Sequence, residues 1–506
     1  MKKFLLKEYI EKLYKENLIL EDNTDDKMKD EVVNLLSYNS KEVEKNTLFV
    51  CKGATFKKEY LADAISSGVM AYVSETKFDV EVPCILVKNS YIALAALSEM
   101  YFDFPTDKLN VIGITGTKGK STTAYYIKYI LDEYMKSKNK KETAIISSID
   151  TIDGVIKEES HITTPESYEL ERHFRNAVNS DMENVVMEVS SQALKMGRVH
   201  SVNFDVGVFL NISEDHISPI EHKDFNDYFE SKLKIFKHSK LACINLDSDH
   251  VDRVIEASSD SPKVITFSKT NSTADIYAYN IKKVEDSIIF MVKTPEYEKE
   301  FELTMPGLFN VENALAAISV CYALNIPVQF IHDGLRIARS SGRMELYSTK
   351  DKNILALVDY AHNKLSFEKL FESTKAEYPD RKILIVFGCP GKKALLRRKD
   401  LGTIAGKYAD KVYLTAEDPG AEPVIDICND IASYVSKYTS NYEIIEDREE
   451  AIKKAILTAP DNSIILLTGK GNETRQKYGT EYIPCLSDVE CVKKYFDEYD
   501  KNGKGE

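Results

Sequence analysis

The strongest constraint on the fold is residues 109–131, which pass from an apolar run through glycines into an amphipathic segment. LNVIGIT predicts a buried strand and GTKGKSTT a loop, while AYYIKYILDEYM predicts a helix whose apolar residues Ile127, Ile130 and Leu131 recur at helical spacing. Similar strand-like and helix-like stretches alternate through most of the chain. This pattern predicts an α/β protein built on largely parallel sheets.

The glycine loop predicts a phosphate-binding site. A loop that ends at a helix N-terminus presents backbone N–H groups and the positive end of the helix dipole to an anion. Lys120 is suited to neutralise the β- and γ-phosphates of a nucleotide, and Ser121 to ligate magnesium. The strict P-loop pattern requires glycine at position 114, where this chain has Ile114, so a plain glycine turn is the alternative. The candidate nucleotide-binding residues here are Gly116, Thr117, Lys118, Gly119, Lys120, Ser121 and Thr122.

Length and composition limit the remaining possibilities. A chain of 506 residues exceeds one hydrophobic core, and we expect three domains, at 1–107, 108–339 and 340–506. The net charge of −14 disfavours nucleic acid as a partner. No apolar window is long enough to span a membrane, and charged residues interrupt the N-terminal segment, so we expect a cytoplasmic location. We also expect a monomer. The eight cysteines form no CxxC pair, which argues against a zinc ribbon or disulfide framework.

Three further residues suggest a metal site. Glu188 ends the predicted strand ENVVMEVS, and His216 follows the strand FDVGVFLNIS, so both are placed at the sheet edge where α/β proteins bind ligands. Lys232 falls within the apolar stripe of the predicted helix KDFNDYFESKLKIF. Its ammonium either extends past the apolar side chains to water, or its buried neutral amine takes up carbon dioxide to form an anionic carbamate.

These segments resemble the Mur ligases, which share with folylpolyglutamate synthetases the loop variant TGT-x-GK-[ST]. The stretch NISEDHISPIEHKDFNDYFESKLKIF resembles the family segment in which a histidine and a carbamylated lysine serve a magnesium site, here His216 and Lys232. The resemblance implies an N-terminal uridine-binding α/β domain, a central P-loop ATPase-like parallel sheet and a C-terminal Rossmann-like domain. It also implies Mg²⁺ ligation by Ser121, Glu188, His216 and the carbamate of Lys232.

Other stretches of the resemblance imply substrate contacts. NSK resembles the DSR uridine motif and retains Ser40; HITTPES matches the TTP motif, and MEVSSQALKMGRV matches EVSSHAL, with Gln192 in place of the usual histidine. The implied contacts to UDP-N-acetylmuramoyl-L-Ala-D-Glu are Ser40, Thr163, Thr164, Ser190 and Arg198. The motifs G-x-F-N-x-x-N-A-x-A-A, GRME and VDYAH imply nucleotide contacts by Asn313, Arg343, Asp359 and His362.

The implied activity is an ATP-dependent ligation through an acyl phosphate on the D-Glu γ-carboxylate. The resemblance assigns its catalysis to Lys120, Glu188, His216, Lys232 and Arg343. A folylpolyglutamate-type ligase, a non-ligating subunit of an amidotransferase and a simple P-loop NTPase remain alternatives. The first would lack the uridine domain and TTP motif, the second would carry a cysteine cluster, and the third would hydrolyse ATP without an amino acid.

The resemblance also bears on the amino acid that is added. Diaminopimelate-adding relatives carry DNPR, whose arginine binds the distal carboxylate; this chain has Glu417, Asp418, Pro419 and Gly420. Two acids without the arginine favour L-lysine, while meso-diaminopimelate and L-ornithine stay open. Lys393 takes the place of the arginine that holds the α-carboxylate, with Arg397 and Arg398 nearby. Gly469 and Glu473 in GKGNE match positions that hold the α-amino end.

Overall fold

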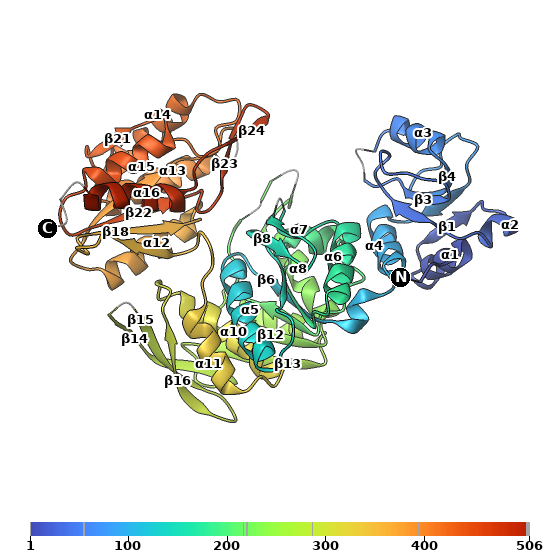
Figure 1. The fold of residues 1–506 in the computed structure, drawn as a ribbon, viewed down its shortest axis with the longest axis horizontal. Coiled ribbons are helices and arrows are strands. Elements are labelled where there is room, and N and C mark those ends of the chain that lie inside the picture. Colours follow the sequence, from blue (N-terminus) through green and yellow to red (C-terminus); the bar gives the residue numbers. More distant parts are fainter. Residues whose placement is uncertain are drawn as a thin grey trace. The chain divides into compact units, whose positions relative to one another are not determined.

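The computed structural model describes residues 2–53, 56–160, 162–215, 217–218, 221–285, 287–392 and 395–501. The chain forms two compact units. The first contains Met1–Tyr277 and Leu315–Gly334, and the second contains Ala278–Ala314 and Leu335–Glu506. Parallel sheets with helices in both units confirm the predicted α/β class (Figure 1).

The first sheet of the first unit has the strand order β1-β5-β4-β3-β2, in which only β1 is antiparallel to its neighbour. Its strands are β1 (Ile19–Asp22), β2 (Leu35–Ser37), β3 (Thr47–Val50), β4 (Val69–Ser74) and β5 (Cys84–Val87). Helices α1 (Leu6–Lys15) and α4 (Ser90–Tyr101) share one buried apolar cluster with the sheet, and α3 (Lys58–Ser66) shares another. A short helix, α2, covers Asp26–Lys29.

The second sheet of the first unit places the glycine loop between buried strands. The order β13-β12-β11-β6-β10-β7 is parallel, and β8 and β9 extend it in antiparallel fashion. Its strands are β6 (Asn110–Thr115), β7 (Ala144–Ile146), β8 (Asp150–Ile152), β9 (Lys157–Glu159), β10 (Asn184–Glu188), β11 (Val206–Phe209), β12 (Leu241–Asn245) and β13 (Lys263–Ser268). Its helices are α5 (Lys120–Ser137), α6 (Ser167–Asn179), α7 (Ser191–Met196), α8 (Phe225–Leu233) and α9 (Val251–Ser258), with 3₁₀ turns at Pro105–Lys108 and Lys234–His238.

The unit boundary falls within β14 (Ile276–Val284), α10 (Asn310–Ala323) and α11 (Val328–Ile337). The second unit also contains an antiparallel pair, β15 (Ser287–Lys293) and β16 (Glu298–Leu303). Its main sheet has the order β17-β18-β22-β19-β20-β21, and only β17 is antiparallel. The strands are β17 (Glu345–Ser348), β18 (Ile354–Asp359), β19 (Lys382–Phe387), β20 (Lys411–Leu414), β21 (Tyr442–Ile444) and β22 (Ser463–Thr468).

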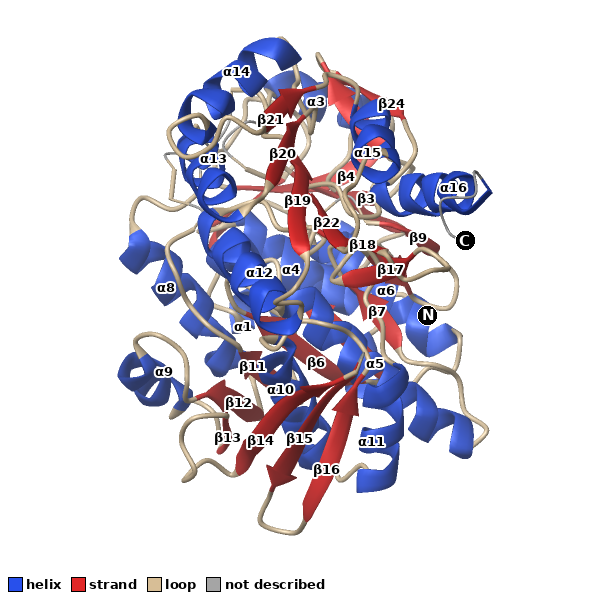
Figure 2. Ribbon diagram, turned by 90° about the vertical axis from the view of Figure 1, so that its left-hand side faces the viewer, coloured by secondary structure: helices blue, strands red, loops and turns tan. Residues whose placement is uncertain are grey.

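Helices cover both faces of this main sheet (Figure 2). α15 (Arg448–Leu457) and α16 (Asp488–Lys501) pack their apolar side chains on one face. α12 (Lys364–Glu377), α13 (Leu396–Tyr408) and α14 (Val424–Val435) lie on the other. A separate two-stranded hairpin of β23 (Arg475–Tyr478) and β24 (Glu481–Pro484) follows β22.

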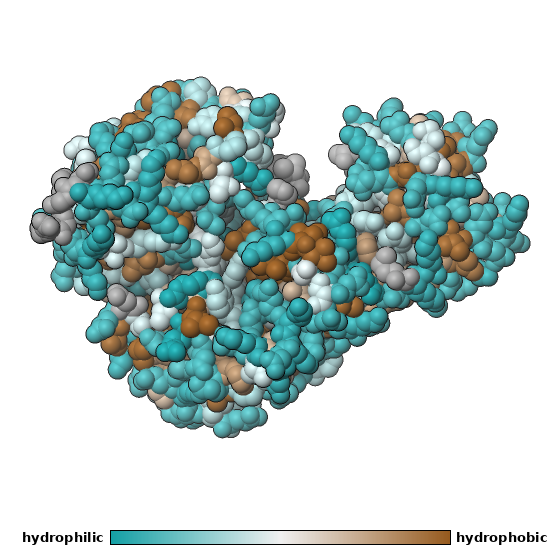
Figure 3. Space-filling model, in the orientation of Figure 1, coloured by the Kyte–Doolittle hydropathy of each residue, from teal (hydrophilic) through white to brown (hydrophobic). Residues whose placement is uncertain are grey.

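The face of the molecule in Figure 3 is mainly hydrophilic, and its apolar residues lie in small groups. Seven of the eight cysteines are buried, none is in a disulfide, and Cys485 is exposed. No helix among the described residues is long and apolar enough to cross a lipid bilayer.

Candidate functional site

The glycine loop connects β6 to α5, as the sequence predicts. Gly119 precedes the helix with a φ of 85°, a left-handed conformation that favours glycine. A Cβ atom on Gly116 would lie 2.9 Å from the Leu210 Cβ, so the close approach of the chain after β11 also requires glycine. The loop is therefore fixed by backbone geometry at the N-terminus of an 18-residue helix.

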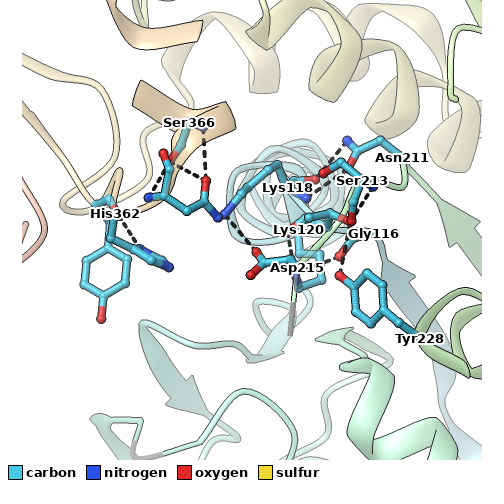
Figure 4. A network of polar contacts seen from close by, with 12 residues as sticks. Gly116, Lys118, Lys120, Asn211, Ser213, Asp215, Tyr228, His362 and Ser366 are labelled. Carbon is cyan, nitrogen blue, oxygen red and sulfur yellow. Dashed lines mark hydrogen bonds and ion pairs between the residues drawn. The ribbon is translucent and has the colours of Figure 1, made fainter. Parts of the chain in front are cut away.

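The segment after β11 braces this loop (Figure 4). The Lys118 N–H donates to the Asn211 Oδ1 at 2.9 Å, and the Ser213 N–H donates to the Thr117 Oγ1 at 3.1 Å. The Lys120 ammonium lies over the loop and donates to the Gly116 carbonyl at 2.9 Å. A flexible cation is thus held at the place where backbone N–H groups of a helix start converge, which suits a phosphate chain.

Oxygen atoms from three elements meet beside the helix start. The Glu188 Oε1, at the end of β10, accepts hydrogen bonds from the Ser148 N–H at 2.8 Å and the Ser148 hydroxyl at 3.1 Å. The Ser148 Oγ also lies 3.1 Å from the Ser121 Oγ. Glu188 is 1% exposed. A carboxylate and hydroxyls are the hard ligands that Mg²⁺ prefers, and the sequence reasoning missed Ser148, which follows β7 at the same sheet edge.

Lys232 is buried on α8, two residues before the helix gives way to a 3₁₀ turn that the sequence did not predict. Its Nζ donates to the Gly116 carbonyl at 2.9 Å and lies 4.7 Å from the centre of the Tyr228 ring. Burial lowers the pKa of Lys232 well below its usual value, and the positive charge of Lys120 lowers it further. The side chain does not extend to water, and the lowered pKa raises the share of the neutral, nucleophilic amine. His216 lies outside the described residues.

The residues assigned to the sugar-peptide substrate form two groups. The Thr164 hydroxyl donates to the Glu188 carbonyl at 3.0 Å, and the Ser190 Oγ accepts from the Ala193 N–H at the start of α7, so both hydroxyls bond within the chain. Arg198 pairs with Glu166 at 2.8 Å. Thr163 is half-buried beside Thr164. Ser40 lines a separate cavity of about 480 Å³, together with Lys52, Phe56, Tyr60 and Tyr168.

In the second unit, three of the residues assigned to the nucleotide lie at the end of β18. The Asp359 carboxylate accepts from the Met344 N–H at 3.0 Å and the Ala361 N–H at 2.7 Å. The Arg343 guanidinium lies 4.5 Å from the centre of the Tyr360 ring, and the His362 Nδ1 is 2.8 Å from the Tyr360 carbonyl. The Asn313 amide, at the start of α10, donates to the Asn310 Oδ1 at 2.9 Å.

The acidic pocket residues meet where β20 and β22 end. The Lys470 ammonium contacts the Asp418 Oδ1 at 3.1 Å and the Glu473 Oε2 at 2.5 Å, and the Tyr360 hydroxyl donates to the Glu473 Oε1 at 2.5 Å. A Cβ atom on Gly469 would lie 3.0 Å from the Glu417 Oε2, and Gly469 has a φ of 98°. Sequence reasoning missed Lys470 and Tyr360, although each is adjacent to a residue that it selected.

The carboxyl group of Glu417 has an unusually high pKa. Burial raises the pKa of Glu417 to about 7, and the neighbouring Asp418 adds to the rise, while the charges of Arg448, Arg397 and Lys470 oppose it. Arg398, which the sequence placed near the α-carboxylate site, forms ion pairs with Glu422 at 2.7 Å and Asp430 at 3.2 Å. Lys393 lies outside the described residues. Asp418 precedes Pro419 and Gly420, whose N–H donates to the Lys477 carbonyl at 3.0 Å.

Known proteins resemble this chain in sequence and in fold. Residues 114–321 match the Mur ligase middle domain, and residues 342–471 match the Mur ligase glutamate ligase domain. The chain is 37% identical over 475 residues to a UDP-N-acetylmuramoyl-L-alanyl-D-glutamate--L-lysine ligase of Enterococcus faecalis, covering 92% of each chain. It is 36% identical to a UDP-N-acetylmuramyl-tripeptide synthetase of Lactobacillus delbrueckii subsp. bulgaricus, covering 93% of this chain and 94% of the relative.

Solved structures extend the likeness in fold to the whole chain. A UDP-N-acetylmuramoyl-L-alanyl-D-glutamate--2,6-diaminopimelate ligase superposes with a TM-score of 0.69 at 23% identity, covering 98% of this chain and 99% of that one. MurF from Acinetobacter baumannii gives 0.63 at 18% identity, covering 99% of each chain. The chain therefore belongs to the Mur ligase family, whose members form carbon–nitrogen bonds.

Proposed function

We propose that this chain joins L-lysine to the D-Glu γ-carboxylate of UDP-N-acetylmuramoyl-L-Ala-D-Glu, at the cost of ATP. The names of relatives that are 37% and 38% identical over nine-tenths of this chain support this reaction. The observation that carries it is the braced loop 116–121, with Lys120 at the start of α5 and the buried Lys232, whose pKa is lowered, beside it. The proposal includes a division of the chain into three domains, at 1–107, 108–339 and 340–506.

ATP is the substrate that activates the carboxylate. Transfer of its terminal phosphoryl group gives an acyl phosphate, which the amine of lysine attacks with loss of phosphate. The loop N–H groups, Lys120 and Arg343 are suited to hold and neutralise the phosphates, as phosphoryl transfer requires. Asn313, Asp359 and His362 are assigned to the nucleotide.

The described oxygen donors fit magnesium. Ser148 lies within hydrogen-bonding distance of both Ser121 and Glu188, and Glu188 is buried. Magnesium would supply charge neutralisation of the phosphates when bound there. His216 is assigned to the same site from the family resemblance.

Lys232 is the proposed carbamate. Its buried amine, whose pKa is lowered, lies against the phosphate loop, and reaction of the neutral form with carbon dioxide forms an N–C bond and releases one proton, which leaves an anion. An anionic side chain next to Lys120 would complete the magnesium ligands without placing a second cation beside the loop.

The remaining assignments concern the two joined substrates. Ser40, Thr163, Thr164, Ser190 and Arg198 are assigned to the UDP-linked dipeptide. The amino acid is assigned to Lys393, Glu417, Asp418, Pro419, Gly420, Gly469 and Glu473. Three carboxyl groups among these residues support a substrate that carries an extra ammonium group and no second carboxylate.

The test is phosphate release with ATP and UDP-N-acetylmuramoyl-L-Ala-D-Glu, comparing L-lysine, meso-diaminopimelate and L-ornithine. We expect turnover that requires both the dipeptide and an amino acid, with the highest kcat/KM for L-lysine. Turnover only with meso-diaminopimelate would overturn the choice of lysine, and ATP hydrolysis that is independent of both substrates would overturn the ligase.

A further inference from the structure

Lys470 is almost completely enclosed, and two carboxylates contact its ammonium. It follows β22 in the loop GKGNE and is 2% exposed. Its ammonium bridges two segments, because Asp418 follows β20 whereas Glu473 lies in the same loop as Lys470. Burial alone would lower the pKa of Lys470, but the charges and hydrogen bonds of Glu473 and Asp418 outweigh burial and raise it. Lys470 is therefore a cation at neutral pH.

The two acids face outward from this lysine. The side chains of Asp418 and Glu473 are 31% and 29% exposed, while the side chain of Lys470 is 3% exposed. Each carboxylate has a further donor: the Lys477 N–H lies 2.9 Å from the Asp418 Oδ1, and the Tyr360 hydroxyl lies 2.5 Å from the Glu473 Oε1. With Glu417, three carboxyl groups adjoin one ammonium, so the cluster keeps a net negative charge for a ligand.

We propose that Lys470 is a positioning residue for the amino-acid substrate: its buried ammonium holds Asp418 and Glu473 together from behind, so that their exposed oxygens jointly receive an ammonium group of the incoming diamino acid. The proposal rests on the proposed function and assigns to that pocket a residue that does not itself touch the substrate. Without the lysine, two carboxylates of like charge repel each other, and one of them takes a proton or turns away.

The experiment compares Lys470→Met, which keeps length and removes charge, with Lys470→Arg. For Lys470→Met we expect the KM for L-lysine to rise about 30-fold, the size of losing a charged hydrogen-bond partner. The KM for ATP and the kcat at saturating lysine should change less than about threefold, because Lys470 acts on one substrate. Lys470→Arg should recover most of the loss, since it retains the charge.

The pH profile separates positioning from simple support of the fold. Lys470 lowers the pKa of Glu417, so its removal should move the acid limb of kcat/KM for lysine to higher pH, and Lys470→Arg should leave that limb in place. Lys494→Met is the matched control, because Lys494 pairs with Glu449 at 2.7 Å on the exposed surface of the same unit. Its KM for lysine should stay within about twofold of the wild type.

Each outcome decides the proposal. The positioning role is wrong if the wild type uses L-lysine and Lys470→Met leaves the KM for L-lysine unchanged. It is also wrong if Lys470→Met raises the KM for ATP and the KM for lysine equally and does not shift the acid limb. If the wild type turns over with no diamino acid, the proposed function fails first, and this proposal fails with it. A selective, pH-shifted loss that arginine rescues supports the proposal.

Discussion

Lys232 and Lys470 are equally buried, each 2% exposed, yet their environments shift their acidity in opposite directions. Lys232 donates to a backbone carbonyl and lies near Lys120, and its pKa falls. Lys470 contacts two carboxylates, and its pKa rises. Burial sets the cost of a charge, but the neighbouring charges decide whether the amine keeps its proton. One lysine is thus suited to react as a nucleophile, and the other to remain a counter-ion.

The largest effect is expected at the phosphate loop. Lys120→Met should lower kcat/KM for ATP by about 10⁴-fold, because a cation that neutralises the transferred phosphoryl group is lost. Lys118→Met is the comparison, since Lys118 lies in the same loop and its side chain pairs with Asp215 at 3.5 Å. Steady-state phosphate release measures both variants. Equal losses in the two would show that the loop, and not Lys120 in particular, carries the effect.

Lys232→Met sharpens the comparison of the two lysines. We expect kcat to fall about 10³-fold, as for other lost electrostatic groups, while the Tm at neutral pH rises relative to the wild type with an unmodified Lys232. The pKa of Lys232 is lower in the folded chain than in the unfolded chain, so the folded state loses stability as pH falls below the unfolded value of about 10.4. Methionine removes that loss.

Thermal unfolding at several pH values checks the sign of this effect, and added short-chain acids should partly restore the activity of Lys232→Ala. Bicarbonate should not restore it, because the variant has no amine. Full activity of the alanine variant would contradict the carbamate.

Glu417→Gln tests whether the carboxyl group of Glu417, in the pocket that contains Lys470, causes the pH dependence. The wild-type kcat/KM for lysine should fall as pH drops below about 7, where Glu417 takes up a proton and attracts an ammonium less. Glutamine should raise the KM about 10-fold at pH 8, less at pH 6, and flatten that limb. A limb that persists in the variant would assign the titration to another group.

The smallest effect is expected for Ser148→Ala. The hydroxyl lies between Ser121 and Glu188, so its loss should raise the magnesium concentration for half-maximal rate about fivefold. Ser148→Thr keeps the hydroxyl and should stay near the wild type. Indistinguishable magnesium dependence in the two variants would remove Ser148 from this site.

Local sequence patterns predicted the parts that depend on neighbouring residues along the chain. The strand, glycine loop and helix at 109–131 follow from period and glycine placement, and Lys232 was recognisable because a charge interrupts an apolar helical stripe. Contacts that depend on tertiary pairing were not predictable. Ser148 lies in a bend without a motif, and Lys470 lies in the GKGNE loop, where the motif selects its neighbours Gly469 and Glu473 but not the lysine itself. Ser148 reaches Glu188 because β7 pairs with β10, and Lys470 reaches Asp418 because the segments after β20 and β22 approach each other.

The exposed Cys485 gives this chain its own place for a spectroscopic label. Its backbone N–H bonds to the Thr474 carbonyl at 2.9 Å, directly after Glu473, and the other seven thiols are buried. Burial raises the pKa of the Cys485 thiol, so a maleimide should attach slowly near neutral pH and at one position per native chain. A fluorophore placed there would lie beside the segment that carries Glu473, without any engineered cysteine.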